Sequence, residues 1–340
     1  MTSATPDTDL LSLDAIRANT SAIASDIHRT PCLTLDTGLT SDLLGGGAAV
    51  LKLECFQHTG TFKARGALTV ARSLDAAQRA RGITAASAGN HAIAAAWAAR
   101  QTGISAKVVI QSNANPFRIA LAKAEGAEVI MKAPGAETFA EAERLVREEG
   151  RHFIHPFEGP PTSLGTAGVG LELMEQAPDL DAVIVSIGGG GLISGVAAAV
   201  KQINPSCKVY GVEPQGAPGM HSALHRGAPG PLDRVDTITD SLGAPMSMPF
   251  SHALCTAYVD EIVLLDDDMI CAGMVAFQQE AKLAVEPAAG AALAAVFGPL
   301  RAKLQGLRTG IIVCGANIDA QSYLALMHRG LSAYQSLTQR

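Results

Sequence analysis

One lysine stands in a setting that suits chemistry as well as solvation. The stretch HTGTFKARGA (residues 58–67) places Lys63 directly after Phe62, with Thr59 and Thr61 just before it. A lysine on a solvated helix face normally has polar neighbours along that face, and Lys63 has few. Lys63 is therefore either an ordinary surface charge or a reactive amine of the kind that forms a Schiff base with a carbonyl compound.

A run of four glycines is the second candidate for chemistry. In AVIVSIGGGGLISGVAAAV (182–200), Gly188, Gly189, Gly190 and Gly191 follow an apolar strand pattern and open a helix pattern. Uncovered backbone N–H groups at a helix N-terminus, together with the helix dipole, can bind a phosphate. A tight turn alone would also use glycine, so the run by itself leaves both interpretations open.

The pattern around the glycines narrows the type of phosphate. Glycines at i, i+2 and i+5 would mark a dinucleotide site, but the third position is Ile193 or Ser194. No G-x-x-x-x-G-K-[ST] sequence occurs. Glu213 ends the next strand pattern where a ribose-binding acid would stand, so a nicotinamide-dependent oxidoreductase remains an alternative. A phosphate site without a nucleotide signature, together with Lys63, favours pyridoxal 5′-phosphate.

The elements that must position these residues alternate between strand and helix patterns. Helix-length stretches at 91–103 and 138–150 separate apolar runs, and a first helix is predicted to begin near Ser12. This alternation, with nearly continuous apolar strands, predicts an α/β fold with parallel sheets covered by helices. The predicted strands are at 49–54, 82–87, 106–111, 127–132, 182–187, 208–213, 261–266 and 310–315.

Composition excludes several classes of protein. The chain has 340 residues, 48% of them hydrophobic, and a net charge of -6 without any basic run, which argues against nucleic acid or anionic membranes as partners. Its apolar runs fall short of the roughly 18 residues of a membrane span, and MTSATPDTDLL is not a secretory signal. The cysteines form no C-x-x-C pair, and the histidine pairs 152/155 and 221/225 lack a third ligand nearby. We therefore predict a cytoplasmic protein with reduced thiols, no bound metal and a small-molecule substrate.

Six motifs in order resemble the fold-type II pyridoxal-phosphate enzymes, in particular the threonine/serine dehydratase and serine racemase group. They are TGTFKARGA (59–67), SAGNHA (87–92), SIGGGGLISG (186–195), GVEP (211–214), VEPAAGAAL (285–293) and CGANID (314–319). The resemblance spans roughly residues 13–325. It implies a two-lobed, tryptophan synthase β-like fold, with a large cofactor-binding domain at 1–70 and 157–340 and a small closing domain at 75–153. The Pro/Gly-dense stretch HPFEGPPTSLG (155–165) is the expected crossing between them.

The resemblance also implies a role for each motif. Lys63 would form the Schiff base with the cofactor and later move a proton at the substrate Cα, with Phe62 near the ring. Cys314 would face the pyridine nitrogen, and Asn90 would contact the 3′-oxygen. The loop Ser87, Ala88, Gly89, Asn90 and His91 would hold the substrate carboxylate. Racemases carry a serine at the position of Ala88, so alanine there favours elimination over racemisation.

Three departures from the group's pattern bear on the substrate and on metals. Gly219 stands where the racemases carry a metal-binding Asp after the Glu of GVEP, so no Mg²⁺ site is expected. GTAG (165–168) replaces a GQGT sequence, and Ile93 replaces a glutamine. Both changes predict a less polar or roomier site, suited to a side chain larger than that of serine, such as 3-phenylserine.

The sequence thus predicts a dehydratase (ammonia-lyase) that converts an L-3-hydroxy-amino acid to a 2-oxo acid and ammonia. Pyridoxal 5′-phosphate is the expected cofactor, and a homodimer is the expected assembly from the group. An amino-acid racemase or a β-replacement synthase of the same fold, a nicotinamide-dependent oxidoreductase, and a binding module that only keeps the fold are the alternatives.

Overall fold

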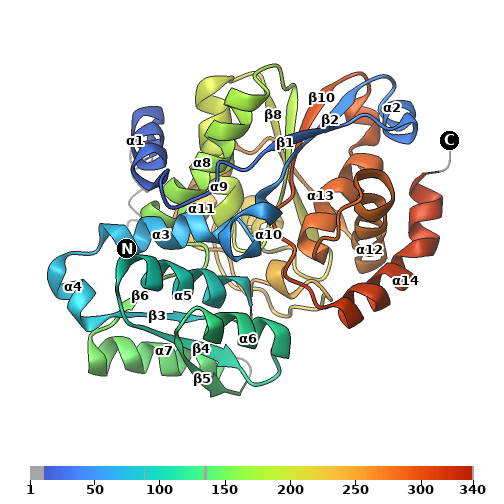
Figure 1. The fold of residues 1–340 in the computed structure, drawn as a ribbon. Coiled ribbons are helices and arrows are strands. Elements are labelled where there is room, and N and C mark those ends of the chain that lie inside the picture. The colour runs from blue at the N-terminus through green and yellow to red at the C-terminus, as the bar shows by residue number, and fades with distance from the viewer. Residues whose placement is uncertain (1–10, 88, 134–135, 339–340) are drawn as a thin grey trace.

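The computed structural model describes residues 11–87, 89–133 and 136–338 and contains two separate sheets (Figure 1). The larger sheet has six strands in the order β1-β2-β10-β7-β8-β9. Its strands are β1 (Cys32–Leu35), β2 (Ala48–Lys52), β7 (Ala182–Ser186), β8 (Lys208–Pro214), β9 (Glu261–Leu265) and β10 (Arg308–Ile312). The smaller sheet has four strands in the order β5-β4-β3-β6. These are β3 (Ile83–Ala86), β4 (Ala106–Gln111), β5 (Glu128–Lys132) and β6 (His152–Phe153).

All strand pairs of both sheets are parallel except β1 with β2. In the middle of the larger sheet Ile311 pairs with Leu51 on one side and Ile184 on the other. Every residue of β7 is buried, which matches its unbroken apolar sequence. The eight predicted strands are all present, with their ends shifted by at most three residues.

Two strands were not predicted from the sequence. The antiparallel strand β1 lies at the edge of the larger sheet and exposes its two central residues, so it lacks the apolar run that marked the others. Strand β6 has only two residues, too few for any pattern. The predicted α/β fold with parallel sheets is confirmed.

Helices cover the larger sheet and form its core with it. They are α2 (Gly38–Leu43), α8 (Pro160–Gln176), α9 (Gly191–Ile203), α10 (Gly219–Arg226), α11 (Pro249–Tyr258), α12 (Asp267–Ala276), α13 (Pro287–Phe297) and α14 (Ala320–Leu337). All residues of α13 are buried against β7, β8 and β10. Helices α8 and α9 pack closely because Gly170 and Gly195 lie at their contact, where a Cβ would come within 2.7 Å and 2.4 Å of backbone oxygens.

The smaller sheet has its own hydrophobic core, shared with helices from the N-terminal part of the chain. It is covered by α5 (Asn90–Thr102), α6 (Pro116–Ala124) and α7 (Ala136–Glu149). Helices α1 (Leu13–Ile23), α3 (Lys63–Ser73) and α4 (Ala76–Arg81) complete the fold, and α3 packs on both α5 and α8. The first helix begins as predicted, because the Ser12 hydroxyl accepts a hydrogen bond from the Ala15 N–H. Figure 1 shows α3 lying along the boundary between the two parts.

Candidate active site

A cavity of about 610 Å³ lies where the carboxyl ends of strands from both sheets meet. Its wall includes Ser87 after β3, Gln111 at the end of β4, Ser186 at the end of β7 and Cys314 after β10. The carboxyl ends of parallel strands are the usual ligand sites of α/β sheets. All the predicted site residues that the structure describes line this cavity: Phe62, Lys63, Ser87, Gly89, Asn90, His91, Gly188, Gly189, Gly190, Gly191 and Cys314. Ala88 lies outside the described residues.

Lys63 is the first residue of α3, and its position is fixed by the end of β10. The Phe62 N–H donates to the carbonyl oxygen of Cys314 at 3.1 Å, and Thr61 forms a bridge with Gly315. The Lys63 ammonium donates to the carbonyl oxygen of Pro156 at 2.9 Å. Burial lowers the pKa of Lys63 from 10.5 to about 8, although the nearby Glu286 carboxylate acts in the opposite direction. Lys63 is therefore a desolvated amine at the cavity wall, and the surface-charge interpretation is wrong.

The glycine run forms a backbone turn at the N-terminus of α9, with Gly190 in the left-handed region at φ 97°. Its backbone approaches Phe157 so closely that side chains would not fit. A Cβ on Gly189 would lie 2.1 Å from the Phe157 ring, and one on Gly191 would lie 2.6 Å from the Phe157 carbonyl oxygen. Within the described residues, the N–H groups of Gly188–Gly191 donate to no protein acceptor.

A second donor beside the glycine turn also lacks a partner. The buried hydroxyl of Ser186 lines the cavity and makes no hydrogen bond. Burying a hydroxyl group without a hydrogen-bond partner costs free energy, unless a bound ligand supplies that partner. Free N–H groups at a helix N-terminus and this hydroxyl fit the phosphate group of pyridoxal 5′-phosphate.

The loop after β3 brings polar side chains to the cavity. The Ser87 hydroxyl accepts from the Gly89 N–H at 3.0 Å. The Asn90 amide donates to both oxygens of Glu286 at 2.9 Å and accepts from the Asn317 amide at 2.9 Å. Asn90 is thus held by two neighbours from distant parts of the chain.

His91 is neutral in this environment. Its Nε2 lies 2.7 Å from the carbonyl oxygen of Ile154, so this nitrogen carries the proton and donates it. Burial and the charge of Lys63 lower the pKa of His91 to about 3. The ring therefore acts as a hydrogen-bonded wall of the site rather than as a cation.

Four residues of the site were missed from the sequence, and they form one polar cluster. Glu286 is buried beside Asn90, and burial raises the pKa of its carboxyl group while Arg118 opposes that rise. Arg118 lies 4.0 Å from Glu286, donates to the Asn317 carbonyl oxygen at 3.0 Å and pairs with Asp240. Arg118 lies on α6, which packs on the smaller sheet. Glu286, Asn317 and Asp240 lie in segments that come after strands of the larger sheet, so the cluster joins the two parts of the fold. VEPAAGAAL and CGANID contain Glu286 and Asn317, but only folding brings Arg118 and Asp240 to them.

Cys314 is buried and follows strand β10, at the wall of the cavity. Burial raises the pKa of its thiol well above the ordinary value, with the Glu286 charge adding to the effect. The thiol is therefore neutral and offers only a weak hydrogen bond.

Glu213 holds a helix rather than a ligand. Its carboxylate accepts from the N–H groups of Met220 and His221 at 2.8 Å each, at the start of α10. Burial raises the pKa of Glu213 to about 8. In the described part of the chain, no group of three or more His, Cys, Asp or Glu residues could hold a metal. All six cysteines are free.

The prediction that Ile93 changes the polarity or size of the site is wrong, whereas Thr166 of the GTAG sequence lies beside Lys63 and Gly191. Ile93 is buried in the core shared by α3 and α5, away from the 610 Å³ cavity. The GTAG sequence lies within α8, where a Cβ on Gly165 would come within 2.6 Å of the Arg65 carbonyl oxygen. The Thr166 hydroxyl donates to the Gly191 carbonyl oxygen at 2.7 Å. Gly165 and Thr166 thus let α8 approach α3 and the glycine turn closely.

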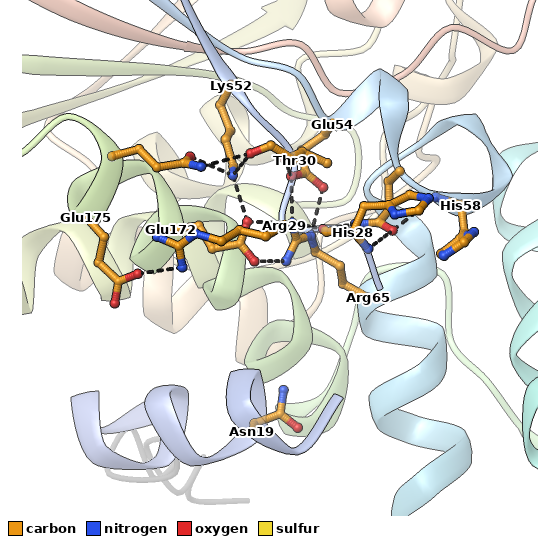
Figure 2. A network of polar contacts seen from close by, with 12 residues as sticks. Asn19, His28, Arg29, Thr30, Lys52, Glu54, His58, Arg65, Glu172 and Glu175 are labelled. Atoms are coloured by element: carbon orange, nitrogen blue, oxygen red, sulfur yellow. Dashed lines mark hydrogen bonds and ion pairs between the residues drawn. The ribbon is translucent and has the colours of Figure 1, made fainter. Parts of the chain in front are cut away.

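Arg65, on the same helix as Lys63, is the centre of a buried ion cluster (Figure 2). The fully buried Arg65 guanidinium donates to Glu54 and Glu172 at 2.8 Å, and Lys52 donates to Glu172 at 2.7 Å. The cluster ties α3 to α8 and to the end of β2. It therefore fixes the helix that carries Lys63, since every charge in it has a partner of opposite sign.

Comparison with known proteins agrees with this geometry. A family model described as pyridoxal-phosphate dependent enzyme matches residues 23–315. The chain is 48% identical to phenylserine dehydratase of Ralstonia pickettii, covering 84% of this chain and 87% of that protein. It is 35% identical to L-threonine ammonia-lyase of Thermotoga maritima, covering 95% and 79%. The structure of maize serine racemase superposes with a TM-score of 0.87 at 34% identity, covering 95% and 99%.

The comparison decides between a pyridoxal-phosphate enzyme and a nicotinamide-dependent oxidoreductase. The matched residues include Lys63, the glycine turn and Cys314, and the superposed structure has the same two-sheet α/β architecture. The predicted resemblance to fold-type II enzymes is confirmed. The chain belongs to the family of pyridoxal-phosphate-dependent enzymes, not to the nicotinamide-dependent oxidoreductases.

Proposed function

We propose that this protein is a dehydratase (ammonia-lyase) that converts an L-3-hydroxy-amino acid to a 2-oxo acid and ammonia. Its relatives include a phenylserine dehydratase, an L-threonine ammonia-lyase and a catabolic L-threonine dehydratase of Escherichia coli. The observation that carries the proposal is the desolvated Lys63 amine at the wall of the cavity that it shares with the glycine turn.

Different residues of the site would bind different parts of the cofactor. The N–H groups of Gly188–Gly191 and the Ser186 hydroxyl would bind the phosphate, and Lys63 would bind the aldehyde covalently. Phe62 would pack near the ring, Asn90 would contact its 3′-oxygen, and Cys314 would face its nitrogen. Bound pyridoxal 5′-phosphate would supply a conjugated ring that withdraws electrons from the substrate Cα.

The chemistry of this chain then centres on one base. Once the substrate amine has replaced Lys63 on the aldehyde, the freed, uncharged Lys63 amine would accept the proton from Cα, and the hydroxyl group would leave from Cβ as water. The Ser87 hydroxyl and the backbone N–H of His91 would hold the substrate carboxylate, because the neutral His91 ring already donates its one proton to Ile154. A neutral Cys314 thiol would leave the ring nitrogen of the bound cofactor unprotonated, so the ring would be a moderate electron acceptor, which favours loss of the β-hydroxyl. The reaction loses one water and then consumes one, so the net products are the 2-oxo acid and ammonia.

Closure of the site is part of the same proposal. We propose that residues 75–153 form a small domain that closes over the substrate and excludes water, and that residues 1–70 and 157–340 form the cofactor domain. The Arg118 contacts to Asn317 and Asp240 would then join the two domains. Solution scattering of the holoenzyme with and without an unreactive amino acid tests this closure.

The compartment and the assembly of the enzyme are also part of the proposal. We propose a cytoplasmic homodimer, because six free thiols suit a reducing compartment and a dimer is expected from the group. In the described residues, no helix is long and apolar enough to cross a membrane. Light scattering after size-exclusion chromatography tests the dimer.

A racemase is the second candidate, because serine racemase of Oryza sativa subsp. indica is 36% identical over 90% of this chain. Racemisation needs an acid on the opposite face of Cα, and the alanine at position 88 cannot supply one. A panel of L-threonine, L-serine, 3-hydroxyaspartate and 3-phenylserine separates the candidates. Release of 2-oxo acid without D-amino acid supports the dehydratase, whereas D-amino acid as the main product would overturn it.

A further inference from the structure

Part of the cavity wall is apolar and has no role in the site described above. Besides the small Ala244 and Pro245, it contains Phe139 from α7, together with Val235 and Leu242. We call these five residues the apolar wall. Phe139 is 42% exposed and Val235 is 37% exposed, although both line the same cavity as Lys63.

Phe139 has no visible role in folding. The face of α7 that packs on the smaller sheet carries Ala142 and Leu145, which are buried in a core cluster with Ala86 and Val109. Phe139 belongs to none of the hydrophobic clusters in the described residues. A single exposed apolar side chain is common on protein surfaces, but one that faces a ligand cavity gains contacts when an apolar ligand binds.

The charges at the cavity argue against an acidic substrate side chain. The cationic side chains among the described wall residues are Lys63 and Arg118. Arg118 is already paired with Asp240 and lies 4.0 Å from Glu286, so it is not available to a second carboxylate. Lys63 is the proposed base. An anionic β-substituent, as in 3-hydroxyaspartate, would therefore lack a partner.

We propose that the apolar wall is the subsite for the β-substituent and selects an aromatic ring, with Phe139 as the specificity-determining residue. This inference rests on the proposed function, because it assigns the side-chain pocket of the same site. An aromatic ring of the substrate packs against the Phe139 ring and removes apolar surface of both from water.

Binding of unreactive amino acids tests the subsite without turnover. L-Phenylalanine and L-alanine lack a β-hydroxyl group and cannot undergo the elimination. Titration calorimetry of the holoenzyme should give tighter binding of L-phenylalanine than of L-alanine. Phe139→Ala should weaken L-phenylalanine binding about tenfold and change L-alanine binding less than about twofold, with Phe139→Leu in between.

Phe117 provides the matched control. It is also a phenylalanine, is 41% exposed and lies on the neighbouring helix α6, but it is not part of the cavity wall. Phe117→Ala should leave both affinities unchanged. The proposal is overturned if Phe139→Ala weakens both ligands equally, if it weakens neither, or if the unaltered enzyme does not prefer L-phenylalanine.

Turnover separates this proposal from the proposed function. In the dehydratase, Phe139→Ala should lower kcat/KM for 3-phenylserine about tenfold and leave that for threonine nearly unchanged. If the enzyme releases no 2-oxo acid but binds L-phenylalanine through Phe139, the subsite stands and the dehydratase assignment fails. If it releases 2-oxo acid and Phe139→Ala affects both substrates alike, the dehydratase stands and the subsite fails.

Discussion

The two sheets share one architecture but differ in how deeply their elements are buried. Strand β7 is buried at every position, whereas β5 has no buried residue. Helix α13 is buried throughout, whereas about half of the described residues of α7 are exposed. The glycine turn is therefore held by buried elements that cannot move without disturbing the hydrophobic core. Phe139 lies on a helix with fewer buried residues. The difference suggests that the cofactor side of the site is rigid and the substrate side is adaptable.

The largest effect is expected at the centre of the rigid side. Lys63→Ala removes the proposed base and the covalent attachment, so kcat should fall at least about a thousandfold. A 2-oxo acid assay measures the rate, and circular dichroism checks that the fold is kept. A rate within tenfold of the unaltered enzyme would mean that another group moves the proton.

A change in the buried ion cluster should strongly lower the stability of the part of the fold that carries Lys63. Glu172→Gln removes the carboxylate that Lys52 and Arg65 share, and breaking a buried pair leaves charge without compensation. The free energy of unfolding should fall by about 3 kcal/mol, measured by urea denaturation. Glu175→Gln on the same helix breaks only a half-exposed pair with Arg29 and should cost less than about 1 kcal/mol.

Helix α7 provides the corresponding change on the smaller sheet. Glu148 pairs with Arg144 and Arg147 at the surface, and these bonds lower the pKa of its carboxyl group. Glu148→Gln should leave the denaturation midpoint unchanged, because solvent screens this group. If Glu148→Gln destabilised the protein as much as Glu172→Gln, the contrast between the two sides would be lost.

The glycine turn should tolerate no side chain. Gly191→Ala places a Cβ 2.6 Å from the Phe157 carbonyl oxygen, and overpacking of this kind typically costs 1–3 kcal/mol. Affinity for pyridoxal 5′-phosphate should fall by roughly tenfold to a hundredfold, measured by fluorescence titration of the cofactor-free enzyme. Gly38→Ala is the control, since nothing lies within 4 Å of its added Cβ, and it should leave the affinity unchanged.

A smaller effect should appear in the pH dependence of cofactor uptake. The amine must be unprotonated to attack the aldehyde, and burial lowers the pKa of Lys63 to about 8. Between pH 7.5 and 8.5 the uncharged fraction rises about threefold, so the rate of reconstitution should rise by that factor. Stopped-flow absorbance measures it. An exposed lysine, whose pKa lies near 10.4, would instead give a rise of about tenfold.

The sequence predicted the framework better than the far side of the site. Apolar strands such as β7 follow directly from local pattern, and Lys63, the glycine turn and Cys314 each lie in a contiguous motif at the cavity. Arg118 and Asp240 were missed because they meet Glu286 and Asn317 only through folding of distant segments. Phe139 was missed because an exposed phenylalanine on a helix has no distinctive local pattern. Ile93 was wrongly expected at the site because a single position in a motif does not reveal which way its side chain points.

Covalent attachment of the cofactor at position 63 is the most direct test of this account. The holoenzyme should be yellow, and reduction with borohydride followed by proteolysis and mass spectrometry should place a pyridoxyl group on the peptide that contains Lys63. Absence of the label there, or its presence on another lysine of a fully loaded and active enzyme, would contradict the account.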